Sequence, residues 1–304
     1  MPAAKSIVIA FAPERWGTLE LFQHFYGNTH HFDRDTQKSL PGTANHFNKA
    51  LILFEVAKQH VTLLSEDRTQ LTECGYTSAR RGRELSALLE SALLDLYSSI
   101  DCTRKVVTFI YRKHGGVKQS TRKFFQSAAG GTIGTTVPEG IRKAFACATW
   151  YTDFRVLRDA ITHSDVGSCH SDEKSGKVFY LHAGLERDGK NLVIEDIFDH
   201  IDKLKDSVNQ FMGQVFQCLN ADLKDDEVWQ MCGVFDGRIY SRLVRPSEAI
   251  DFNSGRCDAF AWFEKEENPV CPFMQECLAY RRKTDEESTT SNPDSTSAQV
   301  ADGR

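Results

Sequence analysis

The chain has 304 residues, of which 40% are hydrophobic and 26% are charged, and its formal net charge is −5. This composition is typical of a globular protein with a sizeable core, and it excludes a chain that is disordered throughout. The negative net charge excludes a uniformly basic surface, so any binding of a polyanion has to come from a local basic patch.

The first apolar run, Ile7 to Phe11, is too short for a signal-peptide core, and no stretch approaches the length of a membrane span. We therefore expect a cytoplasmic protein with no membrane partner. The nine cysteines are scattered and odd in number, and Cys102, Cys147 and Cys218 fall within helical patterns. Reduced, buried thiols are expected at such positions.

Residues 1–42 are interpreted as an N-terminal extension that holds a strand-like run at Ile7 to Phe11 and an aromatic-rich stretch with no assigned structure. Pro41-Gly42-Thr43 is typical of a turn that precedes a helix. The amphipathic helix that follows is indicated by apolar residues at spacings of three and four, namely Phe47, Leu51, Phe54, Ala57 and Val61.

Three more long helices are predicted. The second begins near Ser78 and ends at Gly115-Gly116, and a basic connector follows it. The third runs from Pro138 to His163 with an apolar stripe of Cys147, Trp150, Phe154, Leu157 and Ile161. The fourth has a near-heptad stripe that requires a helical partner, formed by Ile197, Ile201, Leu204, Val208, Phe211, Val215 and Leu219.

Two β-hairpins are also predicted. One lies near 178–194 and turns at Asp188-Gly189, and the other joins 228–232 to 238–244 through Phe235-Asp236-Gly237. The fold expected is mostly α, an antiparallel helix bundle over 43–222 with inserted and C-terminal β-hairpins. Residues 223–282 form a small C-terminal extension, and the polar segment 283–304 is predicted to be a disordered tail.

The segment Leu157-Arg158-Asp159-Ala160-Ile161-Thr162-His163 lies at the end of the third predicted helix. Asp159 and His163 are four residues apart, so a helix places them on the same face. A fixed cation, a histidine that exchanges protons near neutrality and a carboxylate that orients it are the groups that metal-free phosphodiester chemistry needs.

The Leu-Arg-Asp-x-x-x-His string on a late helix of an all-α bundle resembles the HEPN superfamily of Arg-x4-6-His helical domains, found in toxins, defence systems and RNA-processing factors. The resemblance covers about residues 43–222. It implies a metal-independent endoribonuclease, in a toxin or antiviral defence context, that pairs as a homodimer to form one cleft. Asp159 occupies a position that is commonly Asn in the family.

By that resemblance His163 acts as general base or acid and Arg158 binds the scissile phosphate. Asp159 orients His163, and Thr162 and Ser164 contribute hydrogen bonds to the phosphate or ribose. The product expected is a 2′,3′-cyclic phosphate. Neither a metal ion nor a cofactor is part of this interpretation.

Other interpretations stay open. Arginine and histidine are favoured near helix C-termini by the helix dipole, and Asp159 could pair with Arg155 or His163 on an ordinary surface. The chain would then be a non-catalytic helical interaction or scaffold protein. A third alternative is a nucleotide-handling or tRNA-binding module without cleavage.

The basic connector is the candidate RNA contact, because cations follow phosphates and aromatic rings stack on bases. Its cations are Arg112, Lys113, Lys118, Arg122 and Lys123, and Phe124 and Phe125 lie beside them. The alternative, which we prefer, is a solvated helix end followed by two core phenylalanines.

The C-terminal cysteines Cys232, Cys257, Cys271 and Cys277 could be interpreted as a metal site. The Cys-x5-Cys spacing lacks the tight knuckle that specifies zinc, so buried free thiols are favoured and no metal site is predicted.

Overall fold

The computed structural model describes residues 9–10, 17–172, 174–187, 190–249 and 254–281. The chain divides into two compact units, one made of 30–221 and the other of 1–29 together with 222–304. The C-terminal boundary of the larger unit lies one residue from the one expected at 222, whereas its N-terminal boundary lies at residue 30 instead of 43. The predicted tail at 283–304 lies outside the described residues.

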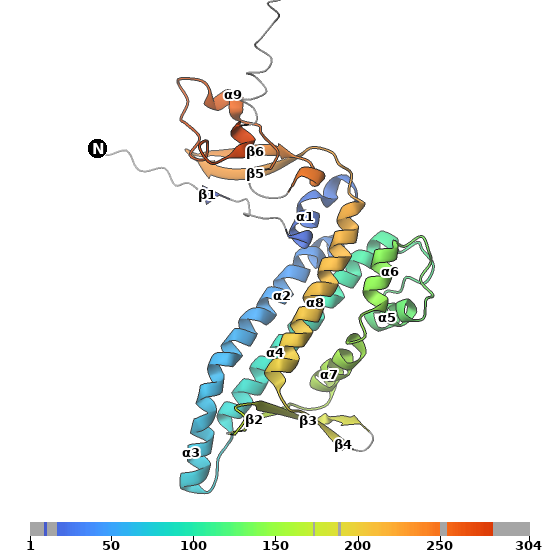
Figure 1. Ribbon diagram of the computed structural model, residues 1–304, viewed down its shortest axis with the longest axis vertical. Helices are drawn as coiled ribbons and strands as arrows, with labels where there is room; N and C mark the ends of the chain where they lie inside the picture. The colour runs from blue at the N-terminus through green and yellow to red at the C-terminus, as the bar shows by residue number, and fades with distance from the viewer. Residues whose placement is uncertain (1–8, 11–16, 173, 188–189, 250–253, 282–304) are drawn as a thin grey trace, which may run out of the picture. The chain divides into compact units, whose positions relative to one another are not determined.

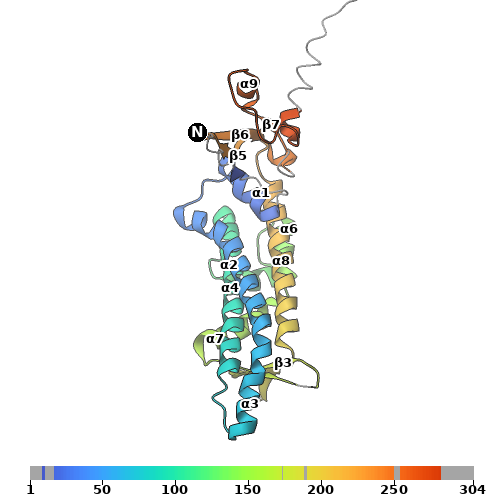
Figure 2. The same ribbon diagram turned by 90° about the vertical axis from the view of Figure 1, so that its left-hand side faces the viewer.

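The larger unit is a bundle of helices that alternate in direction (Figures 1 and 2). One helical hairpin packs the full length of its first helix against its second. Its elements are α2 (Arg34–His60), the 3₁₀ turn η2 (Val61–Leu63), α3 (Leu64–Cys74) and α4 (Arg80–Tyr111). Four more helices follow, namely α5 (Thr121–Ala129), α6 (Glu139–Ala146), α7 (Tyr151–His163) and α8 (Ile197–Ala221). Of these, α7 runs antiparallel to α4 and α8 runs parallel to it (Figure 1).

A three-stranded antiparallel sheet lies between α7 and α8 in the chain, with strand order β2-β3-β4. Its strands are β2 (Ser168–Ser171), β3 (Val178–Arg187) and β4 (Lys190–Ile194). The β3–β4 pair is the hairpin predicted near 178–194, and its turn at Asp188-Gly189 lies outside the described residues. The mostly α fold with peripheral β-hairpins is therefore confirmed, and β2 is an addition that the sequence did not indicate.

Two helix boundaries differ from the prediction. The predicted turn at Pro41-Gly42-Thr43 is wrong, because α2 begins at Arg34 and continues through Pro41. Asp33 caps this start, since its carboxylate accepts the Thr36 N–H at 2.8 Å. Packing against α4 then offsets the one backbone hydrogen bond that a proline removes inside a helix.

The single helix predicted from 138 to 163 is also wrong, since a turn at 147–150 separates α6 from α7. The Tyr151 N–H bonds to the Ala148 carbonyl at 3.1 Å. The turn brings Tyr151 into a stack with Phe125, with ring centroids 3.7 Å apart, and leaves Cys147 exposed. The apolar spacing continues across residues 147–150, although the helix is interrupted there.

The smaller unit contains a four-stranded antiparallel sheet of order β1-β5-β6-β7. The β5–β6 pair confirms the second predicted hairpin, and Asp236 and Gly237 at its turn both have positive φ, 48° and 70°. The strands are β1 (Ile9–Ala10), β5 (Val228–Phe235), β6 (Arg238–Val244) and β7 (Arg256–Cys257). The helical elements are α1 (Thr18–Phe25), η1 (Tyr26–Asn28), η3 (Pro246–Glu248) and α9 (Phe260–Phe263).

Candidate functional site

Arg158 lies on α7 with its guanidinium held against α4. Its Cζ atom lies 4.1 Å from the centre of the Tyr97 ring, and its Nη1 pairs with Asp159 at 2.9 Å. The Nε atom is buried without a hydrogen-bond partner among the described residues. A cation over an aromatic face with one donor unsatisfied is a fixed positive charge that retains hydrogen-bonding capacity.

Asp159 has a different arrangement from the one predicted. Its carboxylate pairs with Arg155 at 2.8 Å through Oδ2 and with Arg158 through Oδ1. No hydrogen bond joins it to His163 within the part of the chain that the structure describes. Asp159 therefore orients two arginines and not His163. Its ion pair with Arg155 is one of the alternatives that the sequence left open.

A pocket of about 270 Å³ surrounds these groups at the meeting of α4, α5 and α7. We call it the arginine pocket, because four arginines line it together with two carboxylates and smaller polar groups. Its lining residues are Tyr97, Asp101, Arg104, Gln119, Ser120, Thr121, Arg122, Arg155, Arg158 and Asp159. The excess of cations makes this pocket suited to an anion, although the whole chain is acidic.

The wall of the arginine pocket on α4 is rigid. The Tyr97 and Tyr151 hydroxyls hydrogen bond at 2.8 Å, and burial raises the pKa of both phenols above their usual value. Arg104 is only 9% exposed, and its Nε donates to the Thr121 hydroxyl at 3.1 Å. Burial lowers the pKa of Arg104, yet an arginine stays charged in a protein.

Tyr97, Asp101 and Arg104 are site residues that the sequence analysis missed. They follow each other at spacings of four and three, which places them on one face of α4. Polar residues at helical spacing beside an apolar stripe are the signal that could have identified this face. This signal is not specific, because the same pattern describes any solvated helix face.

His163 is the last residue of α7, is exposed and does not line the arginine pocket. Its Cα lies about 7.5 Å along the helix axis from that of Arg158, at a rise of 1.5 Å per residue.

The loop that follows His163 is anchored at two points. The Gly167 N–H donates to the buried Glu90 carboxylate at 2.6 Å, and the ring of His182 bonds to the Asp165 carbonyl at 2.6 Å. Glu90 also accepts from the Tyr180 hydroxyl at 2.7 Å. The end of α7 is therefore fixed to both α4 and β3.

Thr162 and Ser164, the predicted donors to phosphate or ribose, are both exposed. The Thr162 hydroxyl donates to the Arg158 carbonyl at 2.8 Å, and the Ser164 N–H bonds to the Ala160 carbonyl. The Thr162 side chain is thus engaged with its own helix.

The predicted RNA contacts of the basic connector separate into groups. Arg122 lines the arginine pocket. Arg112 lies over the Phe109 ring, 4.3 Å from its centre, and both residues line a second pocket, between α2 and α4. Lys113, Lys118 and Lys123 are exposed and line neither pocket. Phe124 and Phe125 are buried, so they belong to the core, and the preferred alternative is confirmed for these two rings.

The four C-terminal cysteines line one small cavity in the smaller unit, beside Phe235, Tyr240 and Phe263. Burial raises the pKa of Cys232 to about 11 and that of Cys257 to about 12. Within the described residues, no group of three or more His, Cys, Asp or Glu side chains is arranged to hold a metal ion. None of the four forms a disulfide with another described cysteine.

Comparison with models of protein families, with curated proteins and with solved structures finds no match to this chain. Among the described helices, none is both long and apolar enough to cross a membrane.

Proposed function

We propose that the chain is a metal-independent endoribonuclease of the HEPN type, with Arg158 and His163 as its catalytic residues. The observation that supports this most directly is the arginine pocket around Arg158, five residues before the exposed His163 on the same helix. A pocket suited to an anion and a histidine suited to proton transfer, the two requirements of the reaction, support the proposal because both lie on α7.

In the proposed reaction, neutral His163 removes the proton of a ribose 2′-hydroxyl. The 2′-oxygen then attacks the adjacent phosphorus, the bond to the 5′-oxygen breaks, and that oxygen takes a proton from water as it leaves. The products are a 2′,3′-cyclic phosphate and a 5′-hydroxyl. Arg158 stabilises the negative charge that develops on the phosphate, and Asp159 positions Arg158.

A homodimer belongs to the same proposal, because His163 does not line the arginine pocket of its own chain. Two copies paired near the C-terminal ends of α7 would place His163 of one copy at the arginine pocket of the other. The anchored loop after His163 favours this arrangement, since a fixed helix end presents the imidazole in one position.

The test is incubation of the purified protein with structured RNA in EDTA. We expect cleavage by the wild type, and a loss of about 100-fold or more for His163→Ala and for Arg158→Ala. His31→Ala and Arg83→Ala are matched controls, since both residues are exposed and lie outside the arginine pocket. Equal cleavage by all five proteins, or none by the wild type, contradicts the mechanism.

A non-catalytic RNA-binding or scaffold protein is the second candidate. It is favoured by the contacts that Arg158 already makes with Asp159 and Tyr97, which are those of a structural arginine. RNA binding by the wild type without cleavage supports this candidate. A toxin or defence role is tested separately: growth inhibition on expression should be relieved by His163→Ala and not by His31→Ala.

A further inference from the structure

Arg104 is a buried arginine that forms no ion pair with any of the described residues. It is 9% exposed, and its Nε atom donates to the neutral Thr121 hydroxyl. Thr121 in turn donates to Asp101, whose carboxylate interacts with Arg104 electrostatically without forming an ion pair with it. Burial of a charge is costly unless the charge is paired, and the arrangement leaves Arg104 suited to an anion from outside the chain.

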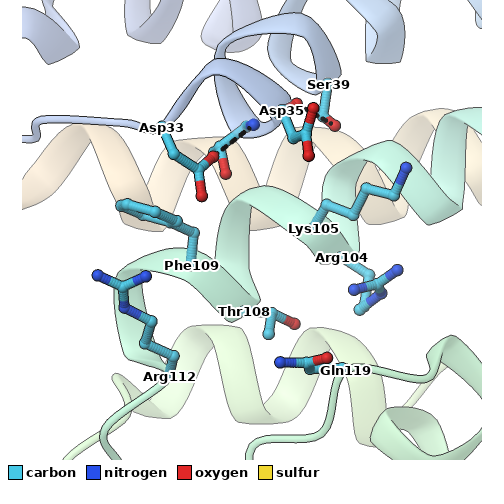
Figure 3. Close-up of a pocket in the computed structure, with 10 residues that line it drawn as sticks. Asp33, Asp35, Ser39, Arg104, Lys105, Thr108, Phe109, Arg112 and Gln119 are labelled. Atoms are coloured by element: carbon cyan, nitrogen blue, oxygen red, sulfur yellow. Dashed lines mark hydrogen bonds between the residues drawn. The ribbon is translucent and has the colours of Figure 1, made fainter.

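Arg104 also lies where two pockets meet. One is the arginine pocket. The other, which we call the α2–α4 cleft, has a volume of about 360 Å³ and is shown in Figure 3. Arg104 and Gln119 line both pockets, so a ligand that extends from one to the other passes these two side chains.

The two walls of the α2–α4 cleft have opposite charge. Arg104 and Lys105 come from α4 and Arg112 directly follows it, and Asp33 and Asp35 face them from the start of α2 (Figure 3). The hydrogen bonds from Thr36 hold the pKa of Asp33 below its usual value, so this carboxylate stays charged at neutral pH. A ligand that fits both walls has an anionic part and a part that donates hydrogen bonds.

A nucleotide has this chemistry, because its phosphate is anionic and the exocyclic amino groups of its base donate to carboxylates. Those amino groups are engaged in a duplex and free in an unpaired strand, which is the form of RNA whose bases proteins usually recognise. The arginine pocket, with Arg122, Arg155 and Arg158, offers a second place for a phosphate of the same strand.

We infer that the α2–α4 cleft and the arginine pocket together bind consecutive nucleotides of one unpaired RNA strand, with Arg104 holding the phosphate between them. The inference rests on the proposed function in that Arg158 holds the scissile phosphate. It does not depend on cleavage, because strand binding at Arg104 precedes any chemistry at His163.

The experiment uses a fluorescent ten-nucleotide RNA with 2′-O-methyl groups, which binds and cannot be cleaved by 2′-hydroxyl attack. Binding to the full-length chain is followed by anisotropy between 50 and 200 mM salt. The variant is Arg104→Met, since an apolar side chain of similar length fills the same space without the cost of a buried charge. Arg83→Met is the matched control on the same helix.

We expect Arg104→Met to bind the strand at least 10-fold more weakly, with its thermal midpoint no lower than that of the wild type. Its log–log salt slope should be shallower by about 0.7, the value for one phosphate contact on a single strand. A fully paired RNA of the same length should bind more weakly than the unpaired one.

Three results overturn the inference: unchanged binding by Arg104→Met, binding of the duplex as tightly as of the single strand, or no binding of the strand by the wild type. The first two leave the proposed ribonuclease intact. Conversely, strand binding that depends on Arg104 in a protein that cleaves no RNA supports the inference and contradicts the ribonuclease.

Discussion

Replacement of the buried Glu90 by leucine should destabilise the larger unit strongly. A single oxygen of Glu90, Oε1, accepts both the Gly167 N–H and the Tyr180 hydroxyl, at 2.6 and 2.7 Å. Leucine fills much of the same volume but accepts neither, so two buried donors lose their partner. Each unsatisfied donor costs about 1–3 kcal/mol, which gives a loss of about 2–6 kcal/mol in the free energy of unfolding.

Glutamine at the same position is the informative comparison. It keeps an oxygen with two lone pairs, while an NH2 group replaces the second oxygen and the charge is lost, so Glu90→Gln should lie within about 1 kcal/mol of the wild type. Urea unfolding followed by circular dichroism at 222 nm measures the difference. For a unit of this size, Glu90→Leu should lower the melting temperature by about 4–24 °C.

Two results would refute the reasoning. One is a Glu90→Leu variant within about 0.5 kcal/mol of the wild type, the range of ordinary surface substitutions. The other is a Glu90→Gln variant as unstable as Glu90→Leu, which would mean that charge and not hydrogen-bond acceptance is what matters. The Tyr180→Phe variant, which removes one donor, should lose little, because the carboxylate keeps its bond to Gly167.

Two further predictions concern titrating groups. Burial lowers the pKa of His200 below its ordinary 6.5, so the unfolded chain binds more protons, and stability should fall as the pH drops from about 7 toward the folded-state pKa. In urea titrations at several pH values, His200→Gln should flatten this dependence of stability on pH. An unchanged dependence in the variant contradicts the prediction. In the native protein the exposed Cys74 and Cys147 should react with a thiol reagent well before Cys232 and Cys257, whose raised pKa leaves little thiolate. Peptide mapping after a short pulse of the reagent measures the order of labelling, and equal labelling of all four cysteines contradicts the prediction.

Helices α4 and α8 and both hairpins were predictable because their signals are local. The stripe from Ile197 to Leu219 defines α8 by itself, and Asp236-Gly237 specifies its turn through the positive φ that each residue adopts. The end of α7 at His163 was predictable for the same reason, because capping and helix-dipole preferences act within one turn.

The features that were missed depend on tertiary contacts. Nothing near Pro41 shows that packing on α4 would carry α2 through a proline, and nothing near Cys147 shows that Tyr151 would stack on Phe125 and interrupt a continuous stripe. Arg104 is the clearest case in the candidate site. Its importance comes from its burial between two pockets, which no spacing within α4 encodes.

The bond between the Tyr97 and Tyr151 hydroxyls has a consequence for the entropy of anion binding. Tyr97 contacts the Arg158 guanidinium with its ring and bonds to the first residue of α7 with its hydroxyl, so one side chain holds both the helix and the arginine that it carries. The conformational entropy of Arg158 is lost when the chain folds and not when an anion arrives. An anion that meets this surface finds a preorganised cation, and such sites gain affinity mainly through a smaller entropic penalty on association.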